Sequence, residues 1–431
     1  MRPGARMKAA VEVLDEIFVH HRPAAQALAD WGKAHRFAGS GDRAAIGNLV
    51  FDVLRRRLSL AARMGDDSTR ALVLAAAPEA FAMTAEEVAA AADGSEYALA
   101  PLTPSERAGL EREVPEDAPA HVRADIPEWL VPSFERAFGD RLVEEGRALA
   151  RRAPVDLRAN TLKADRERVL KALSRFGAEP TPMSPVGVRI PPPAGPGRTP
   201  NVEAEPGHGK GWFEIQDEAS QIAALLSGAS PRRQVLDLCA GAGGKTLAMA
   251  AAMQNTGQVY AYDADRVQLR PIFERLKRAG VRNAQVLPAG DEEAVRALGA
   301  RFDVVLVDAP CTGSGVWRRR PDAKWRVKPQ NLADRQKEQQ EVLELAVPLV
   351  KPGGRLVYVT CSVLPEENKD QVTAFLERHP EFSLQPYAES WAAYIGGTPP
   401  ASADGSSDTL LLTPATHDTD GFFIAILERR K

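Results

Sequence analysis

Two of the three cysteines in this chain carry the clearest chemical signal in its sequence. Cys311 lies in the segment DAPCTGSG (308–315) and Cys361 lies in YVTCS (358–362), and each segment includes or follows a short apolar run. A thiolate is a nucleophile, and loops after the strands of an α/β sheet are where such sheets bind their ligands. The pattern predicts two thiols in one active site, with Asp308 beside them. The alternative is that each cysteine is only a small buried residue.

A glycine-rich segment, DLCAGAGGKT (237–246), also follows an apolar run and precedes a helical pattern. A Walker A loop needs glycine where Cys239 stands, and a dinucleotide loop needs glycine where Thr246 stands, so the segment fits neither. It fits the nucleotide loop of an enzyme that uses S-adenosylmethionine (AdoMet), with a structural turn as the alternative. Cys239 also fits a packing role, and Lys245 could face a cofactor carboxylate or a substrate phosphate. The expected cofactor contacts in this loop are Cys239, Ala240, Gly241, Ala242, Gly243, Gly244 and Lys245.

Three acidic residues follow the next two strand candidates. Asp263 lies about 20 residues beyond the glycines, where an acid can accept hydrogen bonds from both ribose hydroxyls. Asp265, two positions later, is suited to cap the following helix. Asp291 follows the third strand candidate, where an acid could meet the adenine amino group, although a surface loop acid fits the spacing nearly as well.

After Gly211, short β-branched runs alternate with helical patterns, which is typical of a mostly parallel sheet with helices on both faces. Pro271 interrupts one helical pattern and predicts a late start or a kink there. The expected strands are Gln234–Leu238, Gln258–Tyr262, Gln285–Leu287, Phe302–Val307, Arg355–Val359 and Phe422–Leu427. The expected helices are Asp217–Leu226, Thr246–Met253, Val267–Ala279, Glu292–Leu298, Leu332–Leu349 and Glu366–Arg378.

The chain before Gly211 has a different character. Residues 1–80 place apolar side chains at helical spacing, which predicts a helical bundle. Residues 90–128 are acidic and contain prolines, and we expect a loop-rich, helix-poor connection there. Residues 180–206 hold 9 prolines in 27 positions, and we expect a loop or linker that contributes neither a central strand nor a helix interior.

Charge is unevenly distributed along the 431 residues, whose formal net charge is −3. Residues 79–128 hold 3 basic and 12 acidic residues, whereas 151–178 hold 8 basic and 3 acidic, and 318–337 hold 8 basic and 2 acidic. A uniformly basic coat protein is therefore excluded, but the two basic stretches suit a polyanionic partner such as RNA. Trp317 and Trp325 could offer stacking surfaces to its bases, or could simply be core residues.

The overall composition excludes several other classes of protein. Three cysteines are too few for a secreted disulfide framework and suggest reduced thiols. No run approaches the ~18 apolar residues that a membrane span needs, and the N-terminus lacks the apolar core of a signal peptide. We expect a cytoplasmic protein, most simply a monomer, without a membrane segment or a metal site.

The three chemical segments resemble the signature blocks of the RNA cytosine-5 methyltransferases of the Sun/NOL/NOP family. The segments WFEIQDEASQIAALL (212–226), RRRPDAKWRV (318–327) and HDTDGFF (417–423) fit the same pattern in the same order. VDLRANTLK (155–163) resembles the segment that precedes the catalytic core in that family. GDRAAIGNLVFDVLRRR (41–57) is similar to the NusB-type domain of a bacterial 16S rRNA member. One departure is Gly241-Ala242, where Ala-Pro is usual.

The resemblance implies a fold and a division of the chain. It implies a Rossmann-like α/β methyltransferase core, with a mostly parallel sheet and a C-terminal antiparallel strand, preceded by an all-helical domain. The expected domains are a helical, NusB-like RNA-binding domain with its acidic connector (1–140), a small RNA-binding α/β subdomain that ends in a proline-rich loop (141–210), and the catalytic domain (211–431).

The resemblance also implies an activity: transfer of a methyl group from AdoMet to C5 of a cytosine in RNA, most simply 16S rRNA. Cytosine C5 is a poor nucleophile until a thiolate adds to C6, so the reaction calls for covalent catalysis. The residue types alone do not decide which cysteine attacks, since Pro310-Cys311 resembles the nucleophile motif of DNA cytosine-5 methyltransferases. The RNA family instead uses the cysteine that corresponds to Cys361, while Cys311 assists release. Asp308, held in an apolar and partly dry site, would supply a proton to N3.

Other functions remain compatible with the sequence. The same chemistry could act on tRNA or on another rRNA position. An alternative function of a different class is that of a non-catalytic RNA-binding factor in ribosome assembly. A protein that only binds RNA, however, has no use for two thiols at strand ends. A nucleotide hydrolase is disfavoured by the failed Walker pattern.

Overall fold

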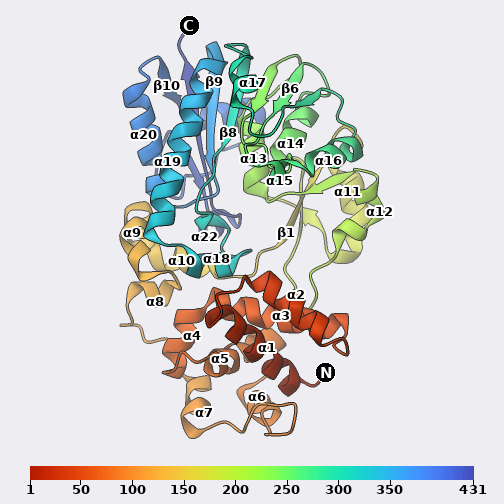
Figure 1. Ribbon diagram of the computed structural model, residues 1–431, viewed down its shortest axis with the longest axis vertical. Coiled ribbons are helices and arrows are strands. Elements are labelled where there is room, and N and C mark those ends of the chain that lie inside the picture. The colour runs from red at the N-terminus through yellow and green to blue at the C-terminus, as the bar shows by residue number, and fades with distance from the viewer.

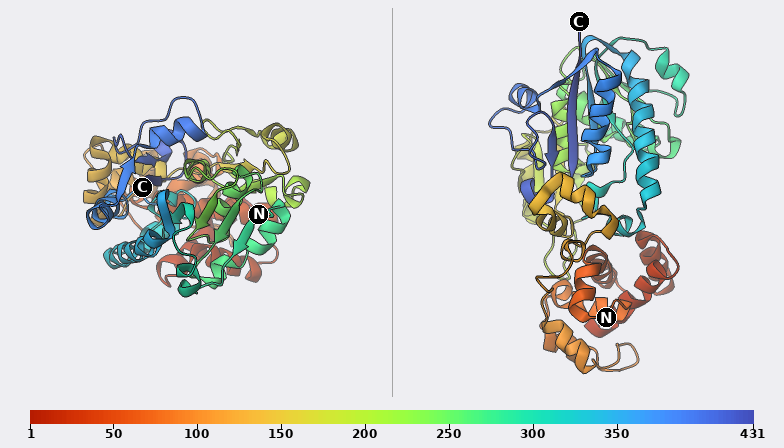
Figure 2. Two further views of the ribbon diagram at one scale, coloured as in Figure 1. Left: turned by 90° about the horizontal axis from the view of Figure 1, so that it is seen from above. Right: turned by 90° about the vertical axis from the view of Figure 1, so that its left-hand side faces the viewer.

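The computed structural model describes all 431 residues, and Figure 1 shows a helical part at one end of an elongated molecule and an α/β part at the other. In both views with the long axis vertical, the helical part lies below the α/β part (Figures 1 and 2). Helix α5 is apolar on every side and lies at the centre of the helical core. The helices of this part are α1 (Pro3–Phe18), α2 (Ala24–Ala34), α3 (Ser40–Arg55), α4 (Arg57–Met64), α5 (Thr69–Phe81), α6 (Ala85–Ala91) and α7 (Pro104–Glu111).

The predicted loop-rich connection at residues 90–128 is wrong in part, because short helices lie in and beside it. Helix α6 begins after Thr84 and helix α7 after Thr103, and each threonine forms a reciprocal capping box with the glutamate three residues on. Three acidic side chains lie in the first turns of these helices, Glu86 and Glu87 in α6 and Glu106 in α7, where they favour the positive end of a helix. A third short helix, α8 (Ala120–Ala124), follows.

The next helices pack against the α/β part, and the first of them also contacts α4 of the helical bundle, where Asp125 accepts hydrogen bonds from the Leu58 and Ser59 N–H groups (both 2.9 Å). These are α8, α9 (Val131–Phe138) and α10 (Leu142–Leu149). Ile126, Leu130 and Phe134 belong to the same buried cluster as the large sheet, and the Phe134 ring stacks on Trp317 with centroids 6.1 Å apart. Residues 120–149 therefore form one continuous core with the catalytic-motif segments.

A small antiparallel sheet follows, with strand order β2-β3-β1-β4. Strand β3 is an interior strand, so the prediction that residues 180–206 contain no central strand is wrong. The prolines flank β3 on both sides and none lies within it, which leaves Val188 and Ile190 free to pair and to be buried. The sheet and its helices are β1 (Val155–Ala159), α11 (Arg166–Leu173), β2 (Glu179–Pro180), β3 (Gly187–Ile190), α12 (Pro206–Gly209) and β4 (Phe213–Ile215).

The position of β4 bears on the expected domain division. β4 lies beyond residue 210 but pairs with β1, so the small sheet draws one strand from the expected catalytic segment. The boundaries at 140 and 210 stay predictions.

The large sheet has the order β10-β12-β9-β8-β5-β6-β7, with β11 paired to β12. Strands β5 to β9 run parallel in this sheet and β12 is antiparallel to β9, which confirms the expected fold class. The strands are β5 (Gln234–Asp237), β6 (Gln258–Ala261), β7 (Ala284–Val286), β8 (Phe302–Asp308), β9 (Val350–Thr360), β10 (Phe382–Gln385), β11 (Leu410–Leu412) and β12 (Phe422–Arg429). Strands β10 and β11 were not among the expected ones.

Helices cover both faces of this sheet, as the alternating burial along β8 shows. Val305 and Val307 pack in the cluster that includes α19 and α20, whereas Val304 and Leu306 pack in the cluster that includes α13 and α14. The predicted break at Pro271 is confirmed, since α15 ends before it and α16 begins after it. The helices are α13 (Glu218–Leu226), α14 (Gly244–Ala252), α15 (Arg266–Leu269), α16 (Ile272–Ala279), α17 (Glu292–Arg296), α18 (Pro321–Arg326), α19 (Pro329–Ala346), α20 (Lys369–Arg378), α21 (Tyr387–Tyr394) and α22 (Pro414–His417). None of the helices has both the length and the apolarity that crossing a membrane requires.

Candidate active site

A cleft of about 1710 Å³ lies at the carboxyl ends of the parallel strands. The segments that follow β5, β6, β8 and β9 all contribute to its walls, because the strands are parallel neighbours and end at the same edge. Nearly all of the expected site residues line it. They are Cys239, Ala240, Gly241, Ala242, Gly244, Lys245, Asp263, Asp308, Cys311 and Cys361.

The two cysteines lie side by side in the wall of this cleft, with their Sγ atoms 3.3 Å apart. Cys361 comes directly after β9 and Cys311 comes three residues after β8, and these two strands pair in parallel. The hydrogen bond with Cys361, together with burial, raises the pKa of the Cys311 thiol well above its usual range. The Cys311 thiol therefore keeps its proton more readily than a free thiol, and its S–H can donate a hydrogen bond to the Cys361 sulfur.

A buried carboxyl group fixes the Cys311 loop from behind. Glu367 accepts hydrogen bonds from the Thr312 backbone N–H (2.8 Å) and hydroxyl (2.6 Å). The Gln339 side chain, from α19, donates to Glu367 (3.1 Å) and to the Pro310 carbonyl (2.9 Å). Burial raises the pKa of Glu367. This network sets the position of Cys311 without contacting its sulfur.

The loops of the two cysteines are also joined directly. The Gly315 N–H donates to the Cys361 carbonyl (2.9 Å), and the Gly421 N–H donates to the Gly315 carbonyl (2.8 Å). A Cβ atom on Gly315 would lie 2.1 Å from the Gly421 carbonyl oxygen, so this approach needs glycine. The close contact brings the segment before β12 against the cysteine pair.

Asp308 forms an ion pair with Lys245, whose Nζ lies 2.6 Å from Oδ2. Lys245 is nearly buried, with 7% of its side chain exposed, and its Nζ lies 5.1 Å from the centroid of the Phe422 ring. The Asp308 side chain is 31% exposed. The structure therefore places an ammonium partner and some solvent beside Asp308, in place of the expected dry, apolar surroundings.

The glycine loop offers an acidic and sterically open site for a cationic cofactor. Gly241 has a φ of +50° and open space where a Cβ would stand, while Gly243 has a φ of +85° and packs against Ile272. Asp237, at the end of β5, is fully buried and its Oδ1 has no hydrogen-bond partner. Burial raises the pKa of Asp237 to about 7. The Thr246 hydroxyl donates to Oδ2 of Asp237 (2.6 Å), so an acid with one free oxygen lies beneath an open glycine loop and fits the positive charge that AdoMet carries.

Asp263 and Asp291 occupy different surroundings. Asp263 follows β6, lines the cleft and accepts hydrogen bonds from the Gly241 and Asp265 N–H groups, both at 2.8 Å. Asp265 caps α15, as expected. Asp291 instead caps α17 on an exposed stretch and does not line the cleft, and its contact with adenine stays a prediction. Gly243 is not among the residues that line the cleft. Cys239 does line it, and burial raises the pKa of its thiol.

The stacking interpretation is wrong for Trp317, which is buried, and for the half-buried Trp325 it stays a prediction. Trp317 is 1% exposed and packs in the core of the large sheet. Trp325 packs against the core of the helical part, and its Nε1 donates to the Leu54 carbonyl at 2.6 Å. Both side chains thus pack against hydrophobic cores of the protein.

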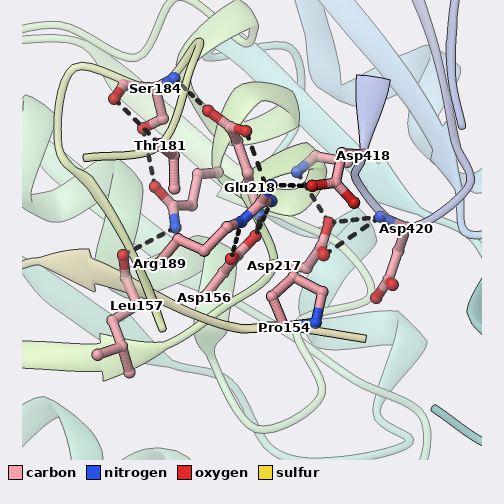
Figure 3. A network of polar contacts seen from close by, with 12 residues as sticks. Pro154, Asp156, Leu157, Thr181, Ser184, Arg189, Asp217, Glu218, Asp418 and Asp420 are labelled. Carbon is pink, nitrogen blue, oxygen red and sulfur yellow. Dashed lines mark hydrogen bonds and ion pairs between the residues drawn. The ribbon is translucent and has the colours of Figure 1, made fainter. Parts of the chain in front are cut away.

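A network of ion pairs on one wall of the cleft was not predicted (Figure 3). Arg189, from β3, reaches Asp156, Glu218 and Asp418. Asp217 accepts a hydrogen bond from the Asp420 N–H at 3.1 Å. The network joins the small sheet, the start of α13 and the segment before β12. Only the motif resemblance of 212–226 and 417–423 hinted at it, because its partners lie up to 229 positions apart.

The comparisons with known proteins agree with this geometry. A family model described as 16S rRNA methyltransferase RsmB/F matches residues 224–428, and one described as an RsmF/B-like ferredoxin-like domain matches residues 126–195. A probable ribosomal RNA small subunit methyltransferase B from Synechocystis is 34% identical over 309 residues, which cover 70% of this chain and 67% of that protein.

Two further proteins support the same relationship. The ribosomal RNA small subunit methyltransferase B of Salmonella typhi is 35% identical over 306 residues, which cover 70% of this chain and 66% of that protein. The crystal structure of PH0851 superposes with a TM-score of 0.74 at 26% identity, and the match covers 100% of this chain and 99% of that chain. The whole arrangement of helical and α/β parts thus has a counterpart in a solved structure.

Proposed function

This chain belongs to the RsmB/F family of 16S rRNA methyltransferases, an RNA methyltransferase family that uses AdoMet, and we propose that it methylates C5 of a cytosine in 16S rRNA. The observation that carries the proposal is the pair of cysteines 3.3 Å apart beside an Asp–Lys ion pair. A methyl transfer to an oxygen or an amine would need no thiol. Activation of a pyrimidine carbon does need one.

We assign the attack on C6 to Cys361. As a thiolate, Cys361 can accept a hydrogen bond from the Cys311 S–H, whose pKa is raised by that hydrogen bond and by burial. Addition of this thiolate to C6 places electron density on C5. Bound AdoMet supplies an electrophilic methyl group, which C5 takes.

The end of the reaction reverses the addition. Solvent base takes the C5 proton, the C5–C6 double bond forms again, and the bond between C6 and the Cys361 sulfur breaks. The Cys311 S–H, 3.3 Å away, can donate a hydrogen bond to the departing sulfur and so lower the barrier to release. The two cysteines thus have different roles in one cycle.

The Asp308–Lys245 pair suits the polar edge of cytosine. A carboxylate accepts a hydrogen bond from the N4 amino group of cytosine and would repel O4 of uracil. The Lys245 ammonium, already 2.6 Å from that carboxylate, is a donor for the negative charge that develops around N3 and O2 during addition. In this assignment Asp308 selects cytosine over uracil and Lys245 stabilises the intermediate, so one ion pair serves both purposes.

AdoMet is best held by the glycine loop and the acids around it. Asp237 and the backbone of residues 239–244 would face its positively charged part, and Asp263 would accept hydrogen bonds from its ribose. The three cysteines are free, which supports placing the reaction in a reducing compartment, the cytoplasm.

Bisulfite sequencing tests the proposal, because 5-methylcytosine resists conversion to uracil. The RNA is 16S rRNA, 23S rRNA and tRNA from cells that lack the gene, compared with the same cells that carry a wild-type copy. Loss of a single 5-methylcytosine in 16S rRNA is the expected result. Loss in tRNA or 23S rRNA would contradict the substrate, and no loss anywhere would favour a non-catalytic assembly factor.

A further inference from the structure

Eight lysines and arginines line the cleft, and seven of them have a carboxylate oxygen within 4.0 Å. The eighth, Arg320, has no ion pair, its guanidinium makes no hydrogen bond, and it is exposed. The paired residues are Lys245 with Asp308, Arg275 with Glu214, Arg296 with Glu292, Arg319 with Asp217 and Asp420, Arg335 with Glu338, Lys337 with Glu341, and Arg378 with Glu344.

The residues immediately before Arg320 hold its backbone in place. Arg318 is 2% exposed, and its Nε donates to Asp420 at 2.5 Å. Arg319 donates to Asp217 at 2.8 Å and to Asp420 at 2.5 Å. These two arginines are therefore neutralised by the protein itself, and Arg320 is the member of the triplet that is left for a ligand.

The residues after Arg320 are anchored in the helical part of the molecule. Asp322, on α18, accepts a hydrogen bond from the Ala24 N–H at the start of α2 (3.2 Å). Lys324 is buried and donates to the Arg55 carbonyl at the end of α3 (2.7 Å), and Trp325 donates to the neighbouring Leu54 carbonyl. An acid at a helix start and a cation at a helix end are both electrostatically favourable. Arg320 thus lies on a segment fixed at both ends.

We propose that Arg320 binds a phosphate of the RNA backbone beside the target cytosine, and that the helical part holds it there through α18. The inference rests on the proposed RNA substrate. The guanidinium fork matches a phosphate group and needs no further conformational change on a backbone already fixed. The site for the cofactor lies at the glycine loop, where the carboxylates of Asp237 and Asp263 attract a cation.

Binding measurements on the full chain test this assignment. The variants are Arg320→Ala and Arg320→Lys. The matched control is Arg107→Ala, which removes another exposed, unpaired arginine, from α7 and outside the cleft. The probe is protein-free 16S rRNA, titrated at several salt concentrations, and AdoMet affinity and the thermal unfolding midpoint are measured in parallel. For Arg320→Ala we expect RNA affinity about tenfold weaker at low salt and a salt slope shallower by about 0.7–0.9.

The other variants complete the expected pattern. Arg320→Lys should keep most of the RNA affinity and the salt slope, because it keeps the charge. AdoMet affinity and the unfolding midpoint should match those of the wild type in all three variants. RNA affinity for Arg320→Ala equal to that of Arg107→Ala would overturn the inference while leaving the proposed reaction intact.

Two further outcomes would also contradict the inference. A loss of AdoMet affinity without a loss of RNA affinity would assign Arg320 to the cofactor carboxylate instead. Wild-type protein that fails to bind 16S rRNA would overturn the proposed substrate and the inference with it.

Discussion

The chemistry of this protein depends on a small number of side chains whose properties are set by their immediate neighbours. Cys311 and Cys361 are the same residue type in similar loops, yet their hydrogen bond makes them unequal, because the pKa of Cys311 is raised. Asp308 and Asp237 are both the last residues of central strands, but Asp308 has an ammonium partner and Asp237 has one oxygen without any partner. Local contacts thus distinguish residues that the sequence alone leaves equivalent.

The raised pKa of Asp237, about 7, predicts that cofactor binding depends on pH. The neutral acid predominates below pH 7 and the carboxylate predominates above it, and only the carboxylate attracts a cationic ligand. The association constant for AdoMet should therefore rise about tenfold between pH 6 and pH 8, since the ionised fraction rises by that factor. Isothermal titration calorimetry across this range measures it.

The control for this prediction is Asp237→Asn, which is nearly isosteric and cannot ionise. It should bind AdoMet more weakly and should lack the part of the pH dependence that belongs to Asp237. A wild-type profile that is flat, or that falls as the pH rises, would contradict the assignment.

The secondary-structure elements bring these residues together, and the sequence predicted most of them. The alternation of strands and helices after Gly211, the break at Pro271 and the meeting of both cysteine loops at one sheet edge follow from hydrophobic patterning and proline chemistry. Strand β3 was missed because its flanking prolines masked a four-residue run without proline. The ion pairs of Arg319 with Asp217 and Asp420 could not be predicted, because they depend on tertiary contacts between distant segments.

Gly315→Ala tests the contact between the cysteine loops. The added Cβ would lie 2.1 Å from the Gly421 carbonyl oxygen, which cannot move without displacing β12. We expect a loss of about 1–3 kcal/mol in the free energy of unfolding. We also expect a loss of methyl transfer activity beyond what this destabilisation explains, because the Gly315 N–H is hydrogen-bonded to the Cys361 carbonyl. Denaturant unfolding and incorporation of labelled methyl groups into RNA measure the two effects.

The control is Gly41→Ala, in α3, where a Cβ meets nothing within 4 Å. It should be neutral or slightly stabilising and should leave methyl transfer unchanged. Equal activity in Gly315→Ala and Gly41→Ala would show that the two cysteine loops do not depend on this contact.

The whole molecule is best regarded as two parts that meet at α18 and at further contacts, such as the ion pair of Arg152 with Asp52 and the hydrogen bonds from the start of α4 to Asp125. The short helix α18 follows the Cys311 loop in sequence, yet its Trp325 packs against the core of the helical part. The expected linker-joined domains are thus in direct contact beside the active site. The basic residues of the cleft show how the charges along the chain combine in the structure. Most of them form ion pairs with carboxylates of the same chain, and Arg320 does not.

Trp325→Ala should weaken the attachment of the helical part. The substitution removes a half-buried indole and its hydrogen bond to Leu54, at a cost of roughly 2–3 kcal/mol. We expect faster proteolytic cleavage between the two parts and weaker RNA binding, with AdoMet affinity unchanged. The matched control is Trp212→Ala, a half-buried tryptophan of the small sheet that does not contact α18. Cleavage of both variants at the same rate and the same sites would contradict a specific role for Trp325.

The central claim is that Cys361 attacks cytosine and Cys311 assists its release, and trapping of the covalent adduct tests it most directly. Each cysteine is replaced by alanine, and each variant is incubated with AdoMet and 16S rRNA and then denatured in SDS. We predict that Cys311→Ala accumulates a protein–RNA adduct resistant to SDS, because release is slowed, and that Cys361→Ala forms none. An adduct with Cys361→Ala and none with Cys311→Ala would contradict the account.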